Sequence, residues 1–206
     1  PAGLVTISNG ELDSDGEFDP TGSMAMSGGN LYIADNDPTW TWSPWPTGGT
    51  VYYDGAAQTI CTNGIDVNGR DYYRTLVLRG SGVKTVSLPF SLDVTRTMTI
   101  EGVTLDIATS GKYFRTNPSR YGAEPATVLT GGGDITGVGN FYSYGNCNMS
   151  SGSVIDVTGQ FRITCRNNGG GTVETSHLNI GSGASVNVGT FYALKQSAAE
   201  LFPAEM

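Results

Sequence analysis

Charged residues are scarce in this sequence, and one sign of charge is missing from its first third. Asp, Glu, Lys and Arg make up 15% of the 206 residues, where about 25% is usual for a soluble domain. Residues 1–69 contain no Lys or Arg, and the net charge of the chain is −8. Such an acidic chain repels the phosphates of nucleic acid, so we expect no nucleic-acid partner.

The bases that the chain does have are concentrated between residues 70 and 120. Attraction between this basic middle and the acidic first third predicts a contact, either within one molecule or between neighbouring molecules. Two separately solvated faces explain the same pattern. Both interpretations stay open from the sequence.

Long apolar runs are also missing. No stretch of 18 apolar residues is present, so we expect no membrane-spanning helix. The sequence begins at Pro1 rather than Met. We therefore expect a processed or trimmed chain, from which an export signal has been removed. The low charge and the 30 glycines favour an exported protein.

Motifs for metal binding and catalysis are absent as well. The three cysteines, Cys61, Cys147 and Cys165, form no CxxC pair, and His177 is the only histidine, so a zinc site is not expected. Either one disulfide with a free thiol or buried unpaired cysteines fit this count. The sequence also has no nucleophile elbow, P-loop or dinucleotide fingerprint. We therefore expect a protein that is not an enzyme and that needs no cofactor.

The sequence does contain an internal repeat. Residues Cys147–Val157 align without a gap on Leu178–Val188, an offset of 31, and Met98–Ile107 is a looser copy. Each copy has an alternating triplet, a Gly-containing turn and a second alternating strand. One such unit cannot bury a core alone, but stacked units can. The repeat predicts an all-β solenoid of stacked strands with loops that project from it.

Short strands are predicted along the whole chain, which we treat as one domain of residues 1–206. Alternation of apolar and polar residues defines them. The predicted strands are 4–7, 23–26, 31–33, 51–53, 75–78, 84–88, 92–94, 98–100, 104–107, 127–129, 134–135, 140–142, 154–157, 161–165, 178–180 and 185–188. Projecting loops are predicted at 35–50, 108–126 and 166–176, and a short helix at 193–202 that caps the last repeat.

Three submotifs occur in order between residues 50 and 110. They are Val51–Ile60 with the sequence VYYDGAAQTI, Tyr72–Val86 with YYRTLVLRGSGVKTV, and Met98–Ile107 with MTIEGVTLDI. This section resembles the repeat units of secreted surface adhesins of Bacteroidetes-type bacteria, and residues 145–192 resemble them more weakly. The resemblance implies a right-handed parallel β-helix and a location outside the cell. The acidic first 35 residues, the Trp-rich segment and the short length depart from the family, which suggests a subunit rather than a long stalk.

The acidic segment near the N-terminus is a candidate calcium loop. The acidic residues Glu11, Asp13, Asp15 and Asp19 alternate with other residues around Gly16. Acids spaced in this way can direct their oxygens at one hard cation such as calcium. Position twelve of that pattern requires Glu, whereas this sequence has Gly22. An exposed strand edge explains the alternation equally well.

Three tryptophans lie within six residues, at Trp40, Trp42 and Trp45. Indole rings on a stiff loop can bind another protein or stack on sugar rings, because they are large and amphipathic. Alternatively, they fold back and pack inside the solenoid. We therefore keep them as candidates for an interface or ligand site.

Carboxylates also fall in or beside strands, at Asp93, Asp106, Asp134 and Asp156. Parallel β-helices host polysaccharide lyases and glycoside hydrolases that use clustered carboxylates. However, Asp106, Asp156 and Asn187 occupy equivalent repeat positions between apolar residues. This spacing predicts a polar ladder on the outer surface. The tyrosine pairs at 52–53 and 72–73 are similarly predicted to be core or ladder residues.

Together these features predict a structural or adhesive subunit that assembles head to tail into a filament or surface layer. The open ends of a solenoid present unpaired strand edges. The N-terminal segment 1–22, with Leu4, Val5 and Ile7, is expected to pair with a neighbour, and Lys112, Arg115 and Arg120 are the basic candidates near its acids. A glycan-binding adhesin and a β-helix lyase or hydrolase are the alternatives.

Overall fold

The computed structural model describes residues 4–20, 22–62, 72–88, 91–117, 125–166 and 176–196. These residues form an all-β structure, and no helix occurs among them. The first strands are β1 (Leu4–Ile7), β2 (Glu11–Ser14), β3 (Ser23–Ile33), β4 (Thr41–Trp42), β5 (Gly48–Tyr53), β6 (Gln58–Thr59), β7 (Thr75–Leu78), β8 (Val83–Val86), β9 (Leu92–Val94) and β10 (Met98–Glu101). The others are β11 (Thr104–Ile107), β12 (Tyr113–Thr116), β13 (Pro125–Thr130), β14 (Asp134–Gly137), β15 (Asn140–Tyr144), β16 (Asn146–Met149), β17 (Val154–Arg166), β18 (Leu178–Ile180) and β19 (Ser185–Gln196).

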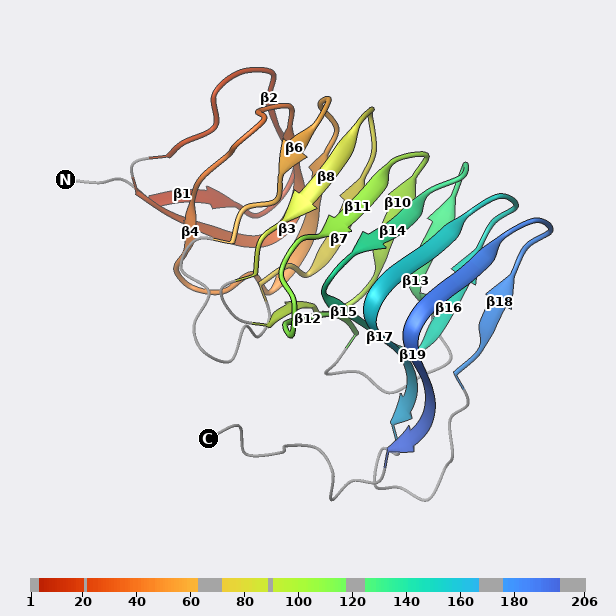
Figure 1. Cartoon of the computed structure of the whole chain (residues 1–206). Coiled ribbons are helices and arrows are strands. Elements are labelled where there is room, and N and C mark those ends of the chain that lie inside the picture. Colours follow the sequence, from red (N-terminus) through yellow and green to blue (C-terminus); the bar gives the residue numbers. More distant parts are fainter. Residues whose placement is uncertain are drawn as a thin grey trace.

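All the strand pairs described are parallel, and they form two sheets. One sheet has the order β1-β3-β5-β7-β10-β13-β16-β18, with β2 and β4 also paired to β3. The other runs β6-β8-β11-β14-β17-β15-β12-β9, with β19 paired to β17. Because β14 pairs with the first part of β17 and β15 with the second part, this sheet turns a corner. Figure 1 shows the successive passes of the chain side by side, from the N-terminal to the C-terminal end.

One pass of the chain, here called a coil, supplies one strand position to each of three sides. For example, β10, β11 and β12 form one coil, and β13, β14 and β15 form the next. Coil length varies, since the register pairs Thr127 with Cys147 and Cys147 with Leu178. The second of these pairs has the 31-residue offset predicted from the repeat, and Ile155 pairs with Val186 in the same way. The two copies of the repeat are therefore paired side by side in the predicted register.

Equivalent side chains from successive coils share one interior. One column on the first sheet consists of Leu31, Val51, Leu76, Met98, Thr127 and Cys147, all buried. On the third side Phe114, Phe141 and Phe161 stand in register, and the last two rings stack with centroids 5.6 Å apart. Burying each large apolar side chain contributes about 1.5–3 kcal/mol, so the core gains stability coil by coil.

The polar ladder lies outside, as predicted. Asp106, Thr136, Asp156 and Asn187 are in register on consecutive coils. The side-chain amide of Asn187 donates a hydrogen bond of 2.9 Å to Asp156. On the first sheet, Asn179 donates to Asn148 at 2.6 Å. These amide bonds join neighbouring coils on their solvent side.

Several predicted elements are different in the structure. The helix predicted at 193–202 is wrong over residues 193–196, which continue strand β19 beside β17, and residues 197–202 lie outside the described part. The loop predicted at 35–50 contains β4 and the start of β5, and that at 108–126 contains β12 and the start of β13. Most of the loop predicted at 166–176 lies outside the described residues. The strands predicted at 23–26 and 31–33 are parts of β3, and those at 154–157 and 161–165 are parts of β17.

Candidate functional site

The last described coil, made of β18 and β19, leaves interior positions open to solvent. Ile180 is 52% exposed, whereas Met149, its register partner on the preceding coil, is 4% exposed. Phe191 is 46% exposed, and its partner Phe161 is fully buried. Each exposed residue continues a buried column by one coil. This end of the stack therefore presents an apolar surface shaped like the interior of the protein.

The strand edges at both ends are open among the described residues. Strands β18 and β19 pair on one edge only, with β16 and β17. Strands β1 and β2 pair only with β3. An open edge carries N–H and C=O groups that can pair with a further parallel strand. The two ends thus offer edges of matching direction.

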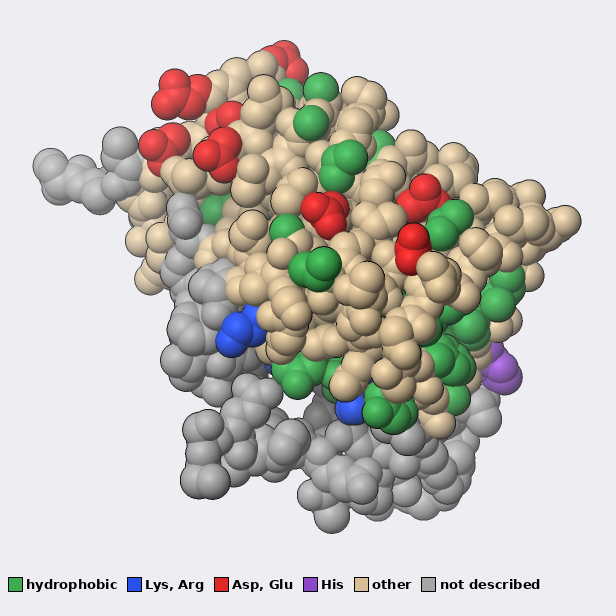
Figure 2. Space-filling view, in the orientation of Figure 1, with side chains coloured by type: hydrophobic (Ala, Val, Ile, Leu, Met, Phe, Trp, Pro, Cys, Tyr) green, Lys and Arg blue, Asp and Glu red, His purple; other side chains and the backbone are tan. Residues whose placement is uncertain are grey.

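The first described coil differs from the last in charge. Residues 4–20 contain five acids and no base, while residues 176–196 contain one lysine and no acid. Figure 2 shows acidic side chains gathered at the N-terminal end of the molecule. Within this coil Leu4 is 58% exposed, Val5 is half-buried, and Ile7 is buried against the core. The two ends of the described chain therefore differ in charge.

The candidate calcium ligands are not gathered into a site. Glu11 accepts hydrogen bonds from Tyr32 at 3.2 Å and from Asn30 at 3.4 Å. Asp19 accepts one from the hydroxyl of Thr39, and the exposed side chains of Asp13 and Asp15 belong to the same coil. In the described part of the chain, no three His, Cys, Asp or Glu side chains are grouped as metal ligands. The calcium site stays a prediction.

Two of the three tryptophans pack inside the protein. Trp40 and Trp42 are 2% and 5% exposed. The ring of Trp40 makes edge contacts with Phe18 and Trp42, both at 5.7 Å between centroids. Trp45 is half-buried against Tyr72, at 5.7 Å. The alternative of intramolecular packing therefore describes Trp40 and Trp42, which are too buried to contact a ligand directly.

A buried lysine, not predicted from the sequence, lies at an interior position of the core. Lys84 stands in register between Gln58 and Leu105, and its side chain is fully buried. Its ammonium donates to the carbonyls of Gly55 at 2.8 Å and Ala56 at 2.5 Å, and to Gln58 Oε1 at 2.6 Å. Burial lowers the pKa of Lys84 to about 8, and the carboxylate of Asp54 opposes that shift.

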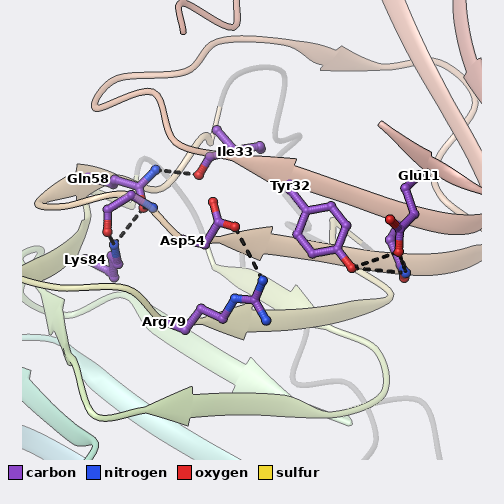
Figure 3. A network of polar contacts seen from close by, with 9 residues as sticks. Glu11, Tyr32, Ile33, Asp54, Gln58, Arg79 and Lys84 are labelled. Atoms are coloured by element: carbon purple, nitrogen blue, oxygen red, sulfur yellow. Dashed lines mark hydrogen bonds and ion pairs between the residues drawn. The ribbon is translucent and has the colours of Figure 1, made fainter. Parts of the chain in front are cut away.

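Gln58 extends this polar network to the preceding coil. Its Nε2 donates to the carbonyls of Ile33 and Asp35, both at 2.8 Å, as Figure 3 shows in part. The network therefore joins three consecutive coils through buried polar groups. The sequence predicted a strand at 84–88 but none at Gln58, and it offered no signal that these two polar side chains would satisfy each other in the core.

An aromatic and basic stack lies outside the same coils. The rings of Tyr32 and Tyr52 are 4.5 Å apart and nearly parallel. The guanidinium of Arg79 lies 4.8 Å from the Tyr52 centroid and 3.4 Å from the carboxylate of Asp54 (Figure 3). This ion pair joins the acidic first third to the basic middle within one molecule. Figure 3 also shows Tyr32 directed toward Glu11.

The remaining predicted residues are spread over the stack. Arg115 forms an ion pair of 2.5 Å with the buried Asp93, and Lys112 is half-buried. Arg120 lies outside the described residues. Among the other carboxylates, Asp134 accepts the backbone N–H of Val154 at 2.7 Å. The carboxylates of Asp93 and Asp134 thus each bind a group on the next coil. The lyase and hydrolase alternatives stay untested predictions.

Cys61 and Cys147 are buried thiols, and the Cys61 sulfur accepts a hydrogen bond from the backbone N–H of Trp40 at 3.4 Å. Burial raises the pKa of the Cys147 thiol to about 12, so it stays protonated. Tyr53, Tyr72 and Tyr73 are buried in the core, as predicted, and Tyr52 belongs to the outer stack. His177 is exposed on the last described coil.

Comparisons of the chain with protein-family models, curated proteins and solved structures found no match. No helix long and apolar enough to cross a membrane occurs among the described residues. The resemblance to adhesin repeats therefore stays a prediction.

Proposed function

We propose that this chain is a non-enzymatic structural or adhesive protein that works outside a bacterial cell. In this proposal its stacked coils are a right-handed parallel β-helix with projecting loops. Copies assemble head to tail, so that the last coil of one copy is covered by the first coil of the next. The glycan-binding adhesin and the polysaccharide-degrading enzyme remain the alternatives.

The observation that carries this proposal is the exposure of Ile180 and Phe191. Their register partners one coil earlier are buried, so a single added coil would bury them too. Their burial would contribute about 1.5–3 kcal/mol for each side chain. Non-closing contacts between the two different ends of a molecule give open filaments rather than closed oligomers.

The register of the stack defines the expected joint. Leu12 and Leu178 occupy the first interior position on their coils, at the two ends of one column. Pairing of β18 with the β2 of a second copy would continue this column and would place Asn179 beside Asp13. The acidic first coil and the acid-free last coil would then be in contact, which favours association at low salt.

Replacing both Ile180 and Phe191 by Glu tests the joint. We expect the native chain to grow in mass with concentration, as measured by light scattering, and I180E/F191E to stay monomeric because its end is charged. The matched control is Val138→Glu, since Val138 is 44% exposed at a turn away from the ends. It should assemble like the native chain. A native chain that stays monomeric over a wide concentration range, or that is unchanged by deletion of residues 1–20, would refute the proposal.

A further inference from the structure

The basic side chains gather on one lateral side of an otherwise acidic protein. Arg74, Arg96, Lys112, Arg115 and Arg162 all lie in or beside the side formed by β9, β12, β15 and the second parts of β17 and β19. We call these five residues the basic face. Of the acids that the structure describes, only Asp93 belongs to these strands. This concentration of cations contrasts with the net charge of −8 for the whole chain.

Cations and aromatic rings alternate along this side. Asp93, Arg115, Tyr142, Arg162 and Tyr192 form one column in register on successive coils. They alternate along their strands with the inward phenylalanines. Asp93 and Tyr142 are buried, Arg115 and Arg162 are half-buried, and Tyr192 is 36% exposed. The Arg162 guanidinium lies 4.5 Å from the Tyr142 centroid and 5.5 Å from that of Tyr192. Each ring thereby holds the guanidinium between two coils.

Further basic residues flank this column. The backbone N–H of Arg96 donates to the carbonyl of Arg74 at 2.9 Å, so these two residues are neighbours on adjacent coils. Arg96 is exposed, and Lys112 is half-buried directly before β12. The Tyr113 and Tyr142 rings lie 4.9 Å apart beside them. Neighbouring coils are about 4.8 Å apart, so Arg74 and Arg96 are one such spacing apart, and Arg115 and Arg162 are two.

We infer that the basic face binds an anionic polysaccharide. Guanidinium groups pair with carboxylate or sulfate groups through two parallel hydrogen bonds, and the exposed ring of Tyr192 offers an amphipathic surface to a pyranose ring. A linear glycan with acidic groups at regular intervals fits cations that recur on every second coil, as Arg115 and Arg162 do. This inference goes beyond the assembly proposed above, since it concerns the side of the stack rather than its ends.

Charge also makes an acidic glycan a better partner than a nucleic acid. Duplex DNA carries one charge in about every 1.7 Å of its axis, and the rest of this protein repels it. A second possible occupant is the acidic first coil of another copy. It would bind the same cations as a protein partner, and the experiment separates these three cases.

The test compares retention on immobilised heparin and polygalacturonate, with dextran as the neutral control. We expect the native chain to bind both acidic glycans at low salt and to leave dextran unbound. Replacing Arg96 and Lys112 together by Gln should weaken binding about tenfold, because two ion pairs worth up to about 1 kcal/mol each are lost. The single variant Arg96→Gln, at an exposed position, should show a smaller loss in the same direction.

The matched control is S81E/S87E, which lowers the net charge by the same two units at exposed residues outside the basic face. Its binding should stay near that of the native chain, and thermal unfolding should show all variants folded. An equal loss in this control, no retention on either acidic glycan, or tighter binding to duplex DNA would overturn the inference. So would an R96Q/K112Q variant that keeps glycan binding but no longer assembles, since the cations would then contact a second copy.

Discussion

At the residue scale, the least expected feature is a lysine at a core position where the coils that follow have leucine or isoleucine. Lys84 is in register with Leu105, Ile135 and Ile155 across consecutive coils. A buried ammonium is costly unless acceptors surround it. Three oxygen atoms do so here, all within 2.8 Å. Lys84, on β8, therefore links the turn after β5 to the next coil.

Replacing Lys84 by Met keeps the aliphatic part of the side chain and removes the three donors. We expect the free energy of unfolding to fall by about 1–3 kcal/mol, because buried oxygens lose their partner. Urea unfolding followed by circular dichroism measures this change. Arg96→Met, at an exposed position, is the control and should change stability by about 0.5 kcal/mol or less. Equal effects of the two substitutions would contradict a special role for Lys84.

Lys84 also predicts a pH dependence. Its pKa is about 8 in the folded protein and about 10.4 in an unfolded chain. Between these values the unfolded chain binds more protons, so the free energy of unfolding rises with pH from about 8 to 10.4 and is unaffected by this group below 8. The difference between the native chain and K84M isolates this contribution. The native chain should therefore gain stability relative to K84M, and a difference that does not widen as pH rises through this window would contradict the prediction.

Comparison of the native chain with K84M is needed because the buried tyrosines change the free energy of unfolding in the opposite direction as pH rises. Burial raises the pKa of Tyr53 and Tyr73 well above the usual value. Their folded forms stay neutral where the unfolded chain ionises, near pH 10, so stability falls above that pH. This loss is shared by the native chain and K84M and cancels in their difference.

At the scale of elements, side chains at the starts of strands fasten one coil to the next. Asp134, Asn140 and Asn146 are the first residues of β14, β15 and β16. Their side-chain oxygens accept the backbone N–H groups of Val154, Gln160 and His177, at 2.7, 2.7 and 2.8 Å respectively. Each bond satisfies a backbone donor at a corner, where the regular ladder is interrupted.

Removing one of these contacts should loosen a corner. Asn140 is 7% exposed, and Asn140→Ala leaves the N–H of the half-buried Gln160 without this partner. We expect a loss of about 1–3 kcal/mol in the free energy of unfolding, together with faster amide exchange at Gln160. Asn179→Ala removes an exposed amide bond on the outer ladder and should cost less. A larger loss for Asn179→Ala than for Asn140→Ala would contradict this account.

Much of this element structure could be predicted because stacking repeats one pattern. Alternation of apolar and polar residues located strands such as β7, β10 and β11, and the repeat gave the register of Ile155 with Val186. Short strands such as β4 and β6 have two residues each and are held by pairing with neighbouring strands. A local sequence pattern therefore cannot reveal them. The helix predicted at 193–202 failed because pairing with β17 decides the conformation of residues 193–196.

The candidate site was less predictable than the fold. The alternation that defines strands gave the outer position of Asp106 and Asp156, which the structure confirms. It did not distinguish a packed tryptophan from an exposed one, because that depends on which coil covers Trp40. Likewise, the basic face combines Arg74, Arg96 and Arg162 from different coils, and only the register brings them to one side.

At the scale of the whole molecule, the two ends of the stack differ while the columns between them are continuous. The N-terminal coil is acidic, and the C-terminal coil exposes Ile180 and Phe191. Ends that differ in this way favour head-to-tail contact over a symmetric pair of identical ends. The lateral side, with its basic face, would then repeat along an assembled filament, and many weak glycan contacts would add up.

Negative-stain electron microscopy of the purified chain over a range of concentrations tests head-to-tail assembly most directly. The proposed joint predicts unbranched fibres one molecule wide that lengthen as concentration rises and that I180E/F191E fails to form. Separate particles of one size at every concentration, or fibres that the double variant still forms, would contradict it.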